Sequence, residues 1–220
     1  MSLSLFGLNE NNNIVTVKRE AVKAPMHQIS VKEKKKRFIK LLLPTVRKVH
    51  DELMQRYERI AKDIHNKTNT QEIELLKQKY KAKSDEDLLA RLKPHPVSIT
   101  LAQAAMESSW ATSRFFKEAN NVFGMWSTNA KESRIAASEK RGGKRTIWLK
   151  KFDTIEDSIR AYYEMIAKAK AYNKFRQQRL HYDDPYKITS GLDKYSEMGP
   201  DYIKVLNQMI KYNNFTKYDH

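Results

Sequence analysis

The longest regular pattern in the sequence is a stripe of apolar residues spaced three or four positions apart over residues 38–64. The stripe consists of Phe38, Leu41, Leu42, Val46, Val49, Leu53, Tyr57, Ile60 and Ile64. This spacing places them on one face of a long α-helix. Pro44 lies inside the stripe. Because proline removes a backbone donor and clashes with the preceding turn, we expect a kink or a restart of the helix there.

Further helices are predicted along the rest of the chain, with little β-structure. The 220 residues include only 6 Gly and 6 Pro, which argues against an all-β fold rich in tight turns. Capping residues predict helix starts at Ser84, Ser98, Ser113, Thr154 and Pro200. Residues 127–152 are predicted to form a small hairpin, with a turn at Gly142-Gly143 and a strand over 147–152. The expected class is therefore α+β and mostly helical.

Changes in composition suggest three parts of the chain. Residues 1–30 contain an Asn run and no sustained period, so we expect a flexible arm. Residues 31–95 are predicted to be a helical part that packs on a core formed by residues 96–220. The boundary is placed where Pro94 and Pro96 interrupt the helical pattern.

The net charge predicts a polyanionic partner. Lys and Arg number 42 against 26 Asp and Glu, which gives a formal charge of +16. Nucleic acid, anionic lipid and the anionic bacterial wall all fit such a surplus. No apolar run approaches the length of a membrane span, and the first residues lack the features of a signal peptide. We therefore expect a cytosolic protein or one whose export signal is absent from this sequence.

Most common catalytic chemistries lack a signature in the sequence. There is no Cys, the 6 His are scattered, and neither HExxH nor a phosphate-binding glycine motif occurs. No Ser lies in a GxSxG elbow. We accordingly expect no metal and no cofactor.

Glu107 is the strongest candidate for a catalytic group. It ends a predicted helix of small and apolar residues, with Gln103 and Trp110 on the same face. Apolar neighbours and the negative end of the helix dipole both raise the pKa of a carboxyl group. A carboxylic acid that keeps its proton near neutral pH is what glycosidic cleavage requires. The alternative is an ordinary solvated helical Glu.

Three segments resemble the glucosaminidase family of bacterial autolysins, which includes the flagellar muramidase-type domain. TLAQAAMESSWATSRFFKEANNVFGMW is similar to that family's LAQAALESGWG…NNLFGI signature. FDTIEDSI and GPDYIKVLNQMIKYNNFTKYD resemble two later family segments, and KKKRFIKLLLPTVRKVHDEL looks like the opening of the Bax-type branch. The resemblance implies a lysozyme-like fold with an N-terminal helical extension, cleavage of the β-1,4 bond after N-acetylglucosamine, and an envelope location.

The resemblance also assigns roles to residues of this chain. It makes Glu107 the catalytic acid and gives Tyr202 a site role, against the alternative of core packing. Asn121, Phe123 and Gly124 match the NNLFG segment, and they are predicted to bind substrate together with Gln103 and Trp126. At Ser109 and Ala111 the sequence departs from the Gly residues usual in the family, so a tighter helix end is expected. For Trp110, core packing is favoured.

A second catalytic carboxylate is expected on the hairpin. Family members place a Glu after NNLFG, and Glu139 is the nearest candidate, with Glu132 as its rival. If neither serves, the N-acetyl oxygen of the substrate can act as the nucleophile.

Three functional hypotheses follow from these features. The first is a monomeric endo-β-N-acetylglucosaminidase acting on peptidoglycan glycan strands, with no nucleic acid involved. The second is a lytic transglycosylase or N-acetylmuramidase on the same fold, although no GLMQ-like segment follows Glu107. The third is a non-catalytic basic module that binds wall, membrane or nucleic acid.

Overall fold

The structure is a computed structural model, and it describes residues 7–8, 14–15, 29–137 and 146–219. The chain divides into two compact units, Met1–Val31 and Lys32–His220. In the first unit, strand β1 (Gly7–Leu8) pairs antiparallel with β2 (Ile14–Val15). The flexible arm expected over residues 1–30 stays a prediction, and the second unit is described below.

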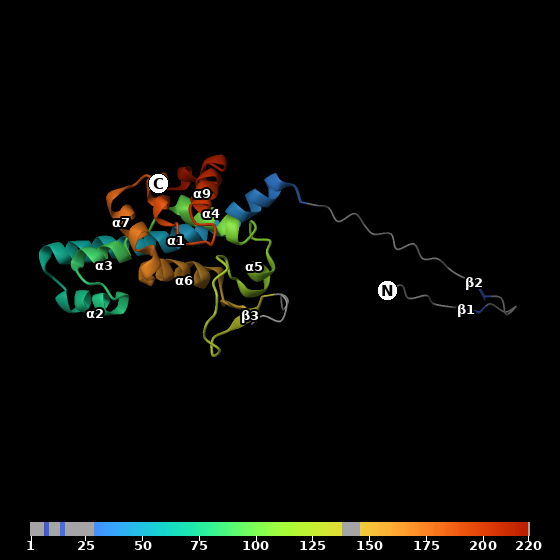
Figure 1. Ribbon diagram of the computed structural model, residues 1–220, viewed down its shortest axis with the longest axis horizontal. Coiled ribbons are helices and arrows are strands. Elements are labelled where there is room, and N and C mark those ends of the chain that lie inside the picture. Colours follow the sequence, from blue (N-terminus) through green and yellow to red (C-terminus); the bar gives the residue numbers. More distant parts are fainter. Residues whose placement is uncertain (1–6, 9–13, 16–28, 138–145, 220) are drawn as a thin grey trace. The chain divides into compact units, whose positions relative to one another are not determined.

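Helices and one small hairpin build the second unit (Figure 1). This arrangement confirms the mostly helical α+β class. The α-helices are α1 (Val31–Asn66), α2 (Thr70–Tyr80), α3 (Asp85–Leu92), α4 (Val97–Glu107), α5 (Arg114–Ala119), α6 (Ile155–Lys168), α7 (Asn173–His181), α8 (Pro185–Ile188) and α9 (Pro200–Tyr212). The short 3-10 helices are η1 (Lys170–Tyr172), η2 (Thr189–Gly191) and η3 (Phe215–Tyr218). No helix in the described ranges has the length and apolar character needed to cross a bilayer.

Helix α1 buries much of the predicted stripe and continues through Pro44 without a restart. The prediction is wrong for Leu41, which is 47% exposed. Phe38, Leu42, Val46, Val49 and Ile60 are buried, as the helical period predicts. A single proline removes only one intrahelical hydrogen bond, and the burial of the stripe on both sides of it keeps the helix continuous.

The apolar side chains form two clusters, and α1 contributes to both. The larger cluster contains the first half of α1 together with residues of α4, α6, α7 and α9. The smaller cluster gathers Ile60, Ile73, Leu76, Tyr80, Leu88, Leu92 and Ala167 from α1, α2, α3 and α6. Helix α4 lies inside the larger cluster, where it packs against α9 and η3.

Capping side chains set the starts of several helices. Ser84, Ser113 and Thr154 accept hydrogen bonds from backbone N–H groups in the first turns of α3, α5 and α6, as predicted. The start predicted at Ser98 is wrong, because α4 begins at Val97 after Pro96. The acceptor at this helix end is the Asp219 carboxylate, 2.7 Å from the Ser98 backbone nitrogen.

The expected hairpin is present in its described part. Strand β3 (Arg134–Ala136) pairs antiparallel with β4 (Trp148–Lys150), with Ile135 opposite Leu149. An isolated bridge joins Trp126 to Leu149, so the hairpin is tied to the segment that follows α5. The turn predicted at Gly142-Gly143 lies outside the described residues.

Candidate active site

Glu107 is the last residue of α4, and it projects from a buried helix toward solvent. Residues from Val97 to Ala105 are all buried, whereas Glu107 is half-buried. The helix stops here because Ser108 captures its end. The Ser108 hydroxyl donates to the Ala104 carbonyl oxygen at 2.5 Å and accepts the Ala111 N–H at 2.8 Å.

A left-handed turn follows immediately. Ser109, Trp110 and Ala111 have φ angles of 52°, 63° and 62°. Each such residue other than glycine costs roughly 1–2 kcal/mol relative to a right-handed conformation. The Trp110 ring packs edge-on against Phe38 with centroids 5.2 Å apart, and it also contacts Phe215 at 6.2 Å. Packing of this partly buried indole therefore holds the chain in a conformation that would suit glycine better.

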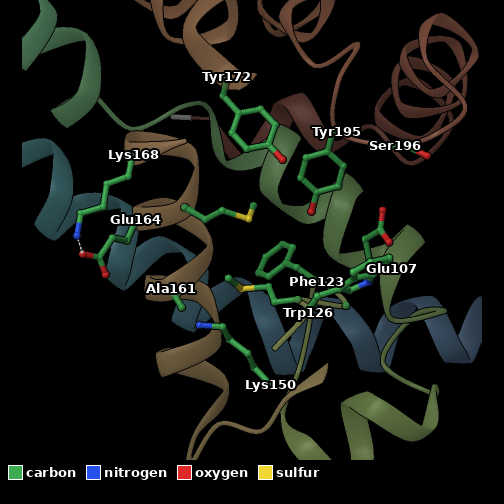
Figure 2. Close-up of a pocket in the computed structure, with 13 residues that line it drawn as sticks. Glu107, Phe123, Trp126, Lys150, Ala161, Glu164, Lys168, Tyr172, Tyr195 and Ser196 are labelled. Carbon is green, nitrogen blue, oxygen red and sulfur yellow. Dashed lines mark hydrogen bonds and ion pairs between the residues drawn. The ribbon is translucent and has the colours of Figure 1, made fainter. Parts of the chain in front are cut away.

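The Glu107 carboxylate lines a cleft of about 620 Å³. Figure 2 shows Glu107 on one side of this cleft and Glu164, paired with Lys168, on the opposite side. The wall is formed by α4, the segment after α5, β4, α6 and the residues around Tyr195. The lining residues that carry the following argument are Phe123, Gly124, Trp126, Lys150, Glu164 and Tyr195.

The environment of Glu107 favours its protonated form. Burial raises the pKa of the carboxyl group, and a hydrogen bond from Tyr202 opposes that effect. The Tyr202 hydroxyl donates to Glu107 Oε1 at 3.4 Å, which is long for a hydrogen bond. Desolvation therefore outweighs the hydrogen bond, and the net pKa shift is upward, as a general acid requires.

Tyr202 is held by a hydrogen-bonded chain that runs into the core. Gln103 Nε2 donates to the Tyr202 hydroxyl at 3.0 Å, and the Tyr162 hydroxyl donates to Gln103 Oε1. The Tyr162 hydroxyl also lies 3.0 Å from His95 Nε2. Gln103, Tyr202 and His95 are each at most 2% exposed. Gln103 thus acts on the site through Tyr202 and does not itself line the cleft.

Asn121 shapes the loop that faces Glu107. Its side-chain amide donates to the carbonyl oxygens of Met125 and Lys150, and its Oδ1 accepts the Met125 N–H at 2.9 Å. Gly124 in this loop has a φ of 62°. A Cβ atom at Gly124 would lie 4.0 Å from Glu107 Oε2, an ordinary contact, so the positive φ is what favours glycine here.

Aromatic rings form much of the cleft wall. Phe123 stacks on Tyr162 with centroids 3.9 Å apart, and Tyr195 stacks on Tyr202 at 5.3 Å. Figure 2 shows the Tyr195 hydroxyl pointing into the cleft between Phe123 and Glu107. Trp126 is 64% exposed at the margin of the cleft, so its ring is available to a ligand.

Other carboxylates near the cleft are held by lysines. Glu132 Oε2 lies 3.2 Å from Lys150 Nζ, and a hydrogen bond from Ser127 together with this lysine lowers the Glu132 pKa. Glu164 Oε1 lies 2.6 Å from Lys168 Nζ, and this contact lowers the Glu164 pKa. Glu139 lies outside the described residues. Within the part of the chain that the structure describes, no cluster of three or more His, Asp or Glu is placed to hold a metal ion.

The structure gathers most of the predicted site residues at one cleft. Glu107, Phe123, Gly124 and Trp126 line it, and Tyr202 reaches it by contacting Glu107. Gln103 and Asn121 are buried behind it. The cleft residues that sequence reasoning missed include Tyr195, Glu164, Lys168 and Lys150. None of these four belongs to a motif, and only folding places them in the same cleft as Glu107.

Family comparison confirms the resemblance. Residues 82–215 match the model of the glucosaminidase family, described as mannosyl-glycoprotein endo-beta-N-acetylglucosaminidase. The match covers more than half of the chain. The chain therefore belongs to the glucosaminidase family and carries a glycosidase domain.

Individual relatives are more distant. Protein bax of Escherichia coli K12 is 28% identical over 132 residues, which are 57% of this chain and 46% of that protein. The chain thus spans about half the length of this curated relative. The catalytic domain of the autolysin Auto from Listeria monocytogenes is 19% identical with a TM-score of 0.49, over 87% of this chain and 98% of that one. The glycoside hydrolase domain of Salmonella typhimurium FlgJ is 20% identical with a TM-score of 0.44, over 59% and 82%.

Proposed function

We propose that this chain hydrolyses peptidoglycan glycan strands at the β-1,4 bond after N-acetylglucosamine. The observation that carries this proposal is a carboxyl group with a raised pKa in the wall of an aromatic-lined cleft. Membership of the glucosaminidase family supports it. The basic surplus suits an anionic wall polymer, and the envelope is the compartment where such a substrate occurs.

In this proposal Glu107 is the general acid. Its proton passes to the glycosidic oxygen as the bond to the anomeric carbon breaks, and the carboxylate becomes charged as the proton leaves. The Tyr202 hydroxyl, already hydrogen-bonded to Oε1, stabilises that developing charge. The exposed Trp126 ring offers an apolar face to a sugar ring, and the buried Phe123 contributes to the cleft wall.

Hydrolysis is complete when a water oxygen bonds to the anomeric carbon and the water gives up a proton. In this proposal a carboxylate of the hairpin has the second catalytic role: it either activates that water or first forms a glycosyl-enzyme bond that the water then breaks. Glu132 fits this role because its lowered pKa keeps it charged, and its partner Lys150 lines the cleft. Glu139 stays the alternative on the same hairpin. Replacing each by alanine and adding azide distinguishes them, because a small anion restores turnover only where a catalytic carboxylate has been removed. If both variants keep activity, the N-acetyl oxygen of the substrate is the nucleophile.

Digestion of purified peptidoglycan tests the proposal. The wild-type protein should release fragments whose reducing ends are N-acetylglucosamine, identified by mass spectrometry after borohydride reduction. Glu107→Gln should release none. Reducing muramic acid ends would indicate a muramidase and 1,6-anhydro ends a lytic transglycosylase, and either would overturn the assigned bond. Undiminished lysis by Glu107→Gln would overturn the role of Glu107.

A further inference from the structure

A second cavity of about 250 Å³ lies among α1, α2, α3, α6 and α7, and its lining is strongly basic. Six cationic side chains contribute to the lining: Arg56, Lys79, Arg91, Lys93, Arg160 and Arg179. Glu164 is the one acidic side chain among its lining residues in the described part of the chain. Cations from five different segments therefore converge on one small space.

Three of these cations are neutralised by carboxylates outside the cavity lining. Arg91 Nε lies 3.0 Å from Asp87, and Arg160 pairs with Glu52 and Glu156. Lys93 Nζ lies 3.7 Å from the Asp183 carboxylate. The acidic side chain in the lining, Glu164, also forms an ion pair, with its Oε1 2.6 Å from Lys168 Nζ.

The other three cations form no direct ion pair in the described residues, although Glu72 acts on Arg56 and Glu164 acts on Lys79 at longer range. Arg56 Nη1 donates to the Tyr80 hydroxyl at 3.3 Å, and both Arg56 and Lys79 lie over the Tyr80 ring. Arg179 is 2% exposed, and burial lowers its pKa to about 9. Its Nε and Nη2 donate to the Ala90 and Arg91 carbonyl oxygens, whereas Nη1 donates to no group in the described ranges.

We propose that this cavity binds an oxyanion, a carboxylate or phosphate carried by the wall polymer outside the reacting sugars. Cationic side chains without a direct ion pair, one of them a buried guanidinium, repel one another, and an anion bound among them would relieve that repulsion. Guanidinium groups bind carboxylate and phosphate oxygens through paired, charge-assisted hydrogen bonds. Arg56, Lys79 and Arg179, which all line the cavity, supply such donors.

The cavity and the cleft are both lined by residues of α6, and this proposal rests on the proposed function. Glu164 lines both spaces. On the rest of α6, Ala161, Met165 and Lys168 line the cleft, whereas Arg160, Tyr163 and Ala167 line the second cavity. A glycan strand in the cleft can therefore place a side group, such as a stem-peptide carboxylate or a phosphate of an attached polymer, across this helix.

The proposal is tested by measuring binding to insoluble wall with variants that all carry Glu107→Gln, so that no substrate is cleaved during the measurement. Adding Arg56→Gln and Lys79→Gln should weaken sedimentation with insoluble wall at least about tenfold, since two charge-assisted contacts are lost. The control adds Lys62→Gln and Lys174→Gln, which remove the same charge from exposed sites that line neither cavity. Lys79→Gln alone, at an exposed side chain, should weaken binding about threefold and guards against misfolding of the double variant.

Repeating the binding measurement on two wall preparations identifies the anion. A tenfold loss that persists on wall stripped of phosphate polymers indicates a carboxylate, whereas a loss that vanishes there indicates phosphate. The proposal is overturned if the variant carrying Arg56→Gln and Lys79→Gln binds wall as well as the control variant carrying Lys62→Gln and Lys174→Gln. If wild-type protein cleaves no glycan but these binding differences remain, only the proposed hydrolysis fails.

Discussion

Removing one hydroxyl, in Tyr202→Phe, tests the hydrogen bonds that connect the core to Glu107. That hydroxyl accepts from Gln103 Nε2 at 3.0 Å and donates to Glu107 Oε1 at 3.4 Å. The substitution therefore leaves a buried amide N–H of Gln103 without an acceptor. An unpaired buried donor costs about 1–3 kcal/mol, which should appear in the free energy of unfolding measured with denaturant.

The same substitution should slow the reaction. A hydrogen bond to a charged group is worth about 1.5–3 kcal/mol at good geometry. The 3.4 Å separation puts this contact at the weak end of that range, so kcat should fall about tenfold. The measurement is the initial rate of wall lysis at saturating substrate.

The pH dependence separates this role from a structural one. The hydroxyl favours the charged carboxylate and so lowers the Glu107 pKa, opposing burial. Without it the pKa rises further, and the acid stays protonated to higher pH. The alkaline limb of the kcat profile should then move to higher pH in Tyr202→Phe.

Tyr172→Phe is the matched control. Tyr172 also lines the cleft, but its hydroxyl makes no hydrogen bond within the described ranges. This variant should keep the wild-type pH limb and unfolding free energy. An alkaline limb that stays in place in Tyr202→Phe, or moves to lower pH, would refute the reasoning even if kcat falls.

Three further predictions concern the stability of the site and its access. Because burial raises the Glu107 pKa, the folded state is less stable when this group is charged. Glu107→Gln should therefore raise Tm, and the gain in Tm should grow as pH rises from 4 to 7. A gain in Tm that does not depend on pH would contradict this. Ser109→Gly and Ala111→Gly should each stabilise by about 1 kcal/mol in denaturant unfolding, because both residues have positive φ, whereas the loop control Ala130→Gly should not. Trp126→Ala should raise KM for wall substrate about tenfold with Tm unchanged, because the ring is exposed; a lowered Tm would indicate a structural role.

Local features of the chain were predictable from sequence because they depend on neighbours a few residues apart. The apolar stripe of α1 and the caps at Ser84, Ser113 and Thr154 follow from helical period and side-chain hydrogen bonding. The start of α4 was not predictable in this way. The acceptor for the Ser98 backbone N–H is Asp219, which is 121 residues away in sequence, and no local pattern predicts such a contact.

The residues of the candidate site also fall into those that the sequence predicts and those that it does not. Glu107, Phe123 and Gly124 belong to a contiguous segment that resembles a known family, so sequence reasoning reached them. Tyr195 and Glu164 have no period or motif of their own, and they share a cleft with Glu107 only because α6 and the segment before α9 fold against its wall.

The buried hydrogen bonds behind Glu107 all point the same way, because each group's donor and acceptor atoms fix which partner donates. Tyr162 uses its hydrogen on Gln103 Oε1, so His95 Nε2, 3.0 Å from the Tyr162 oxygen, must be the donor there. With Oε1 accepting, Gln103 presents its N–H to the Tyr202 oxygen, which leaves the hydrogen of Tyr202 available only to Glu107. Burial keeps His95 neutral by holding its pKa well below the usual value, so this order does not reverse near neutral pH. The core thereby fixes Tyr202 as a donor aimed at the carboxyl group that must acquire charge when its proton leaves.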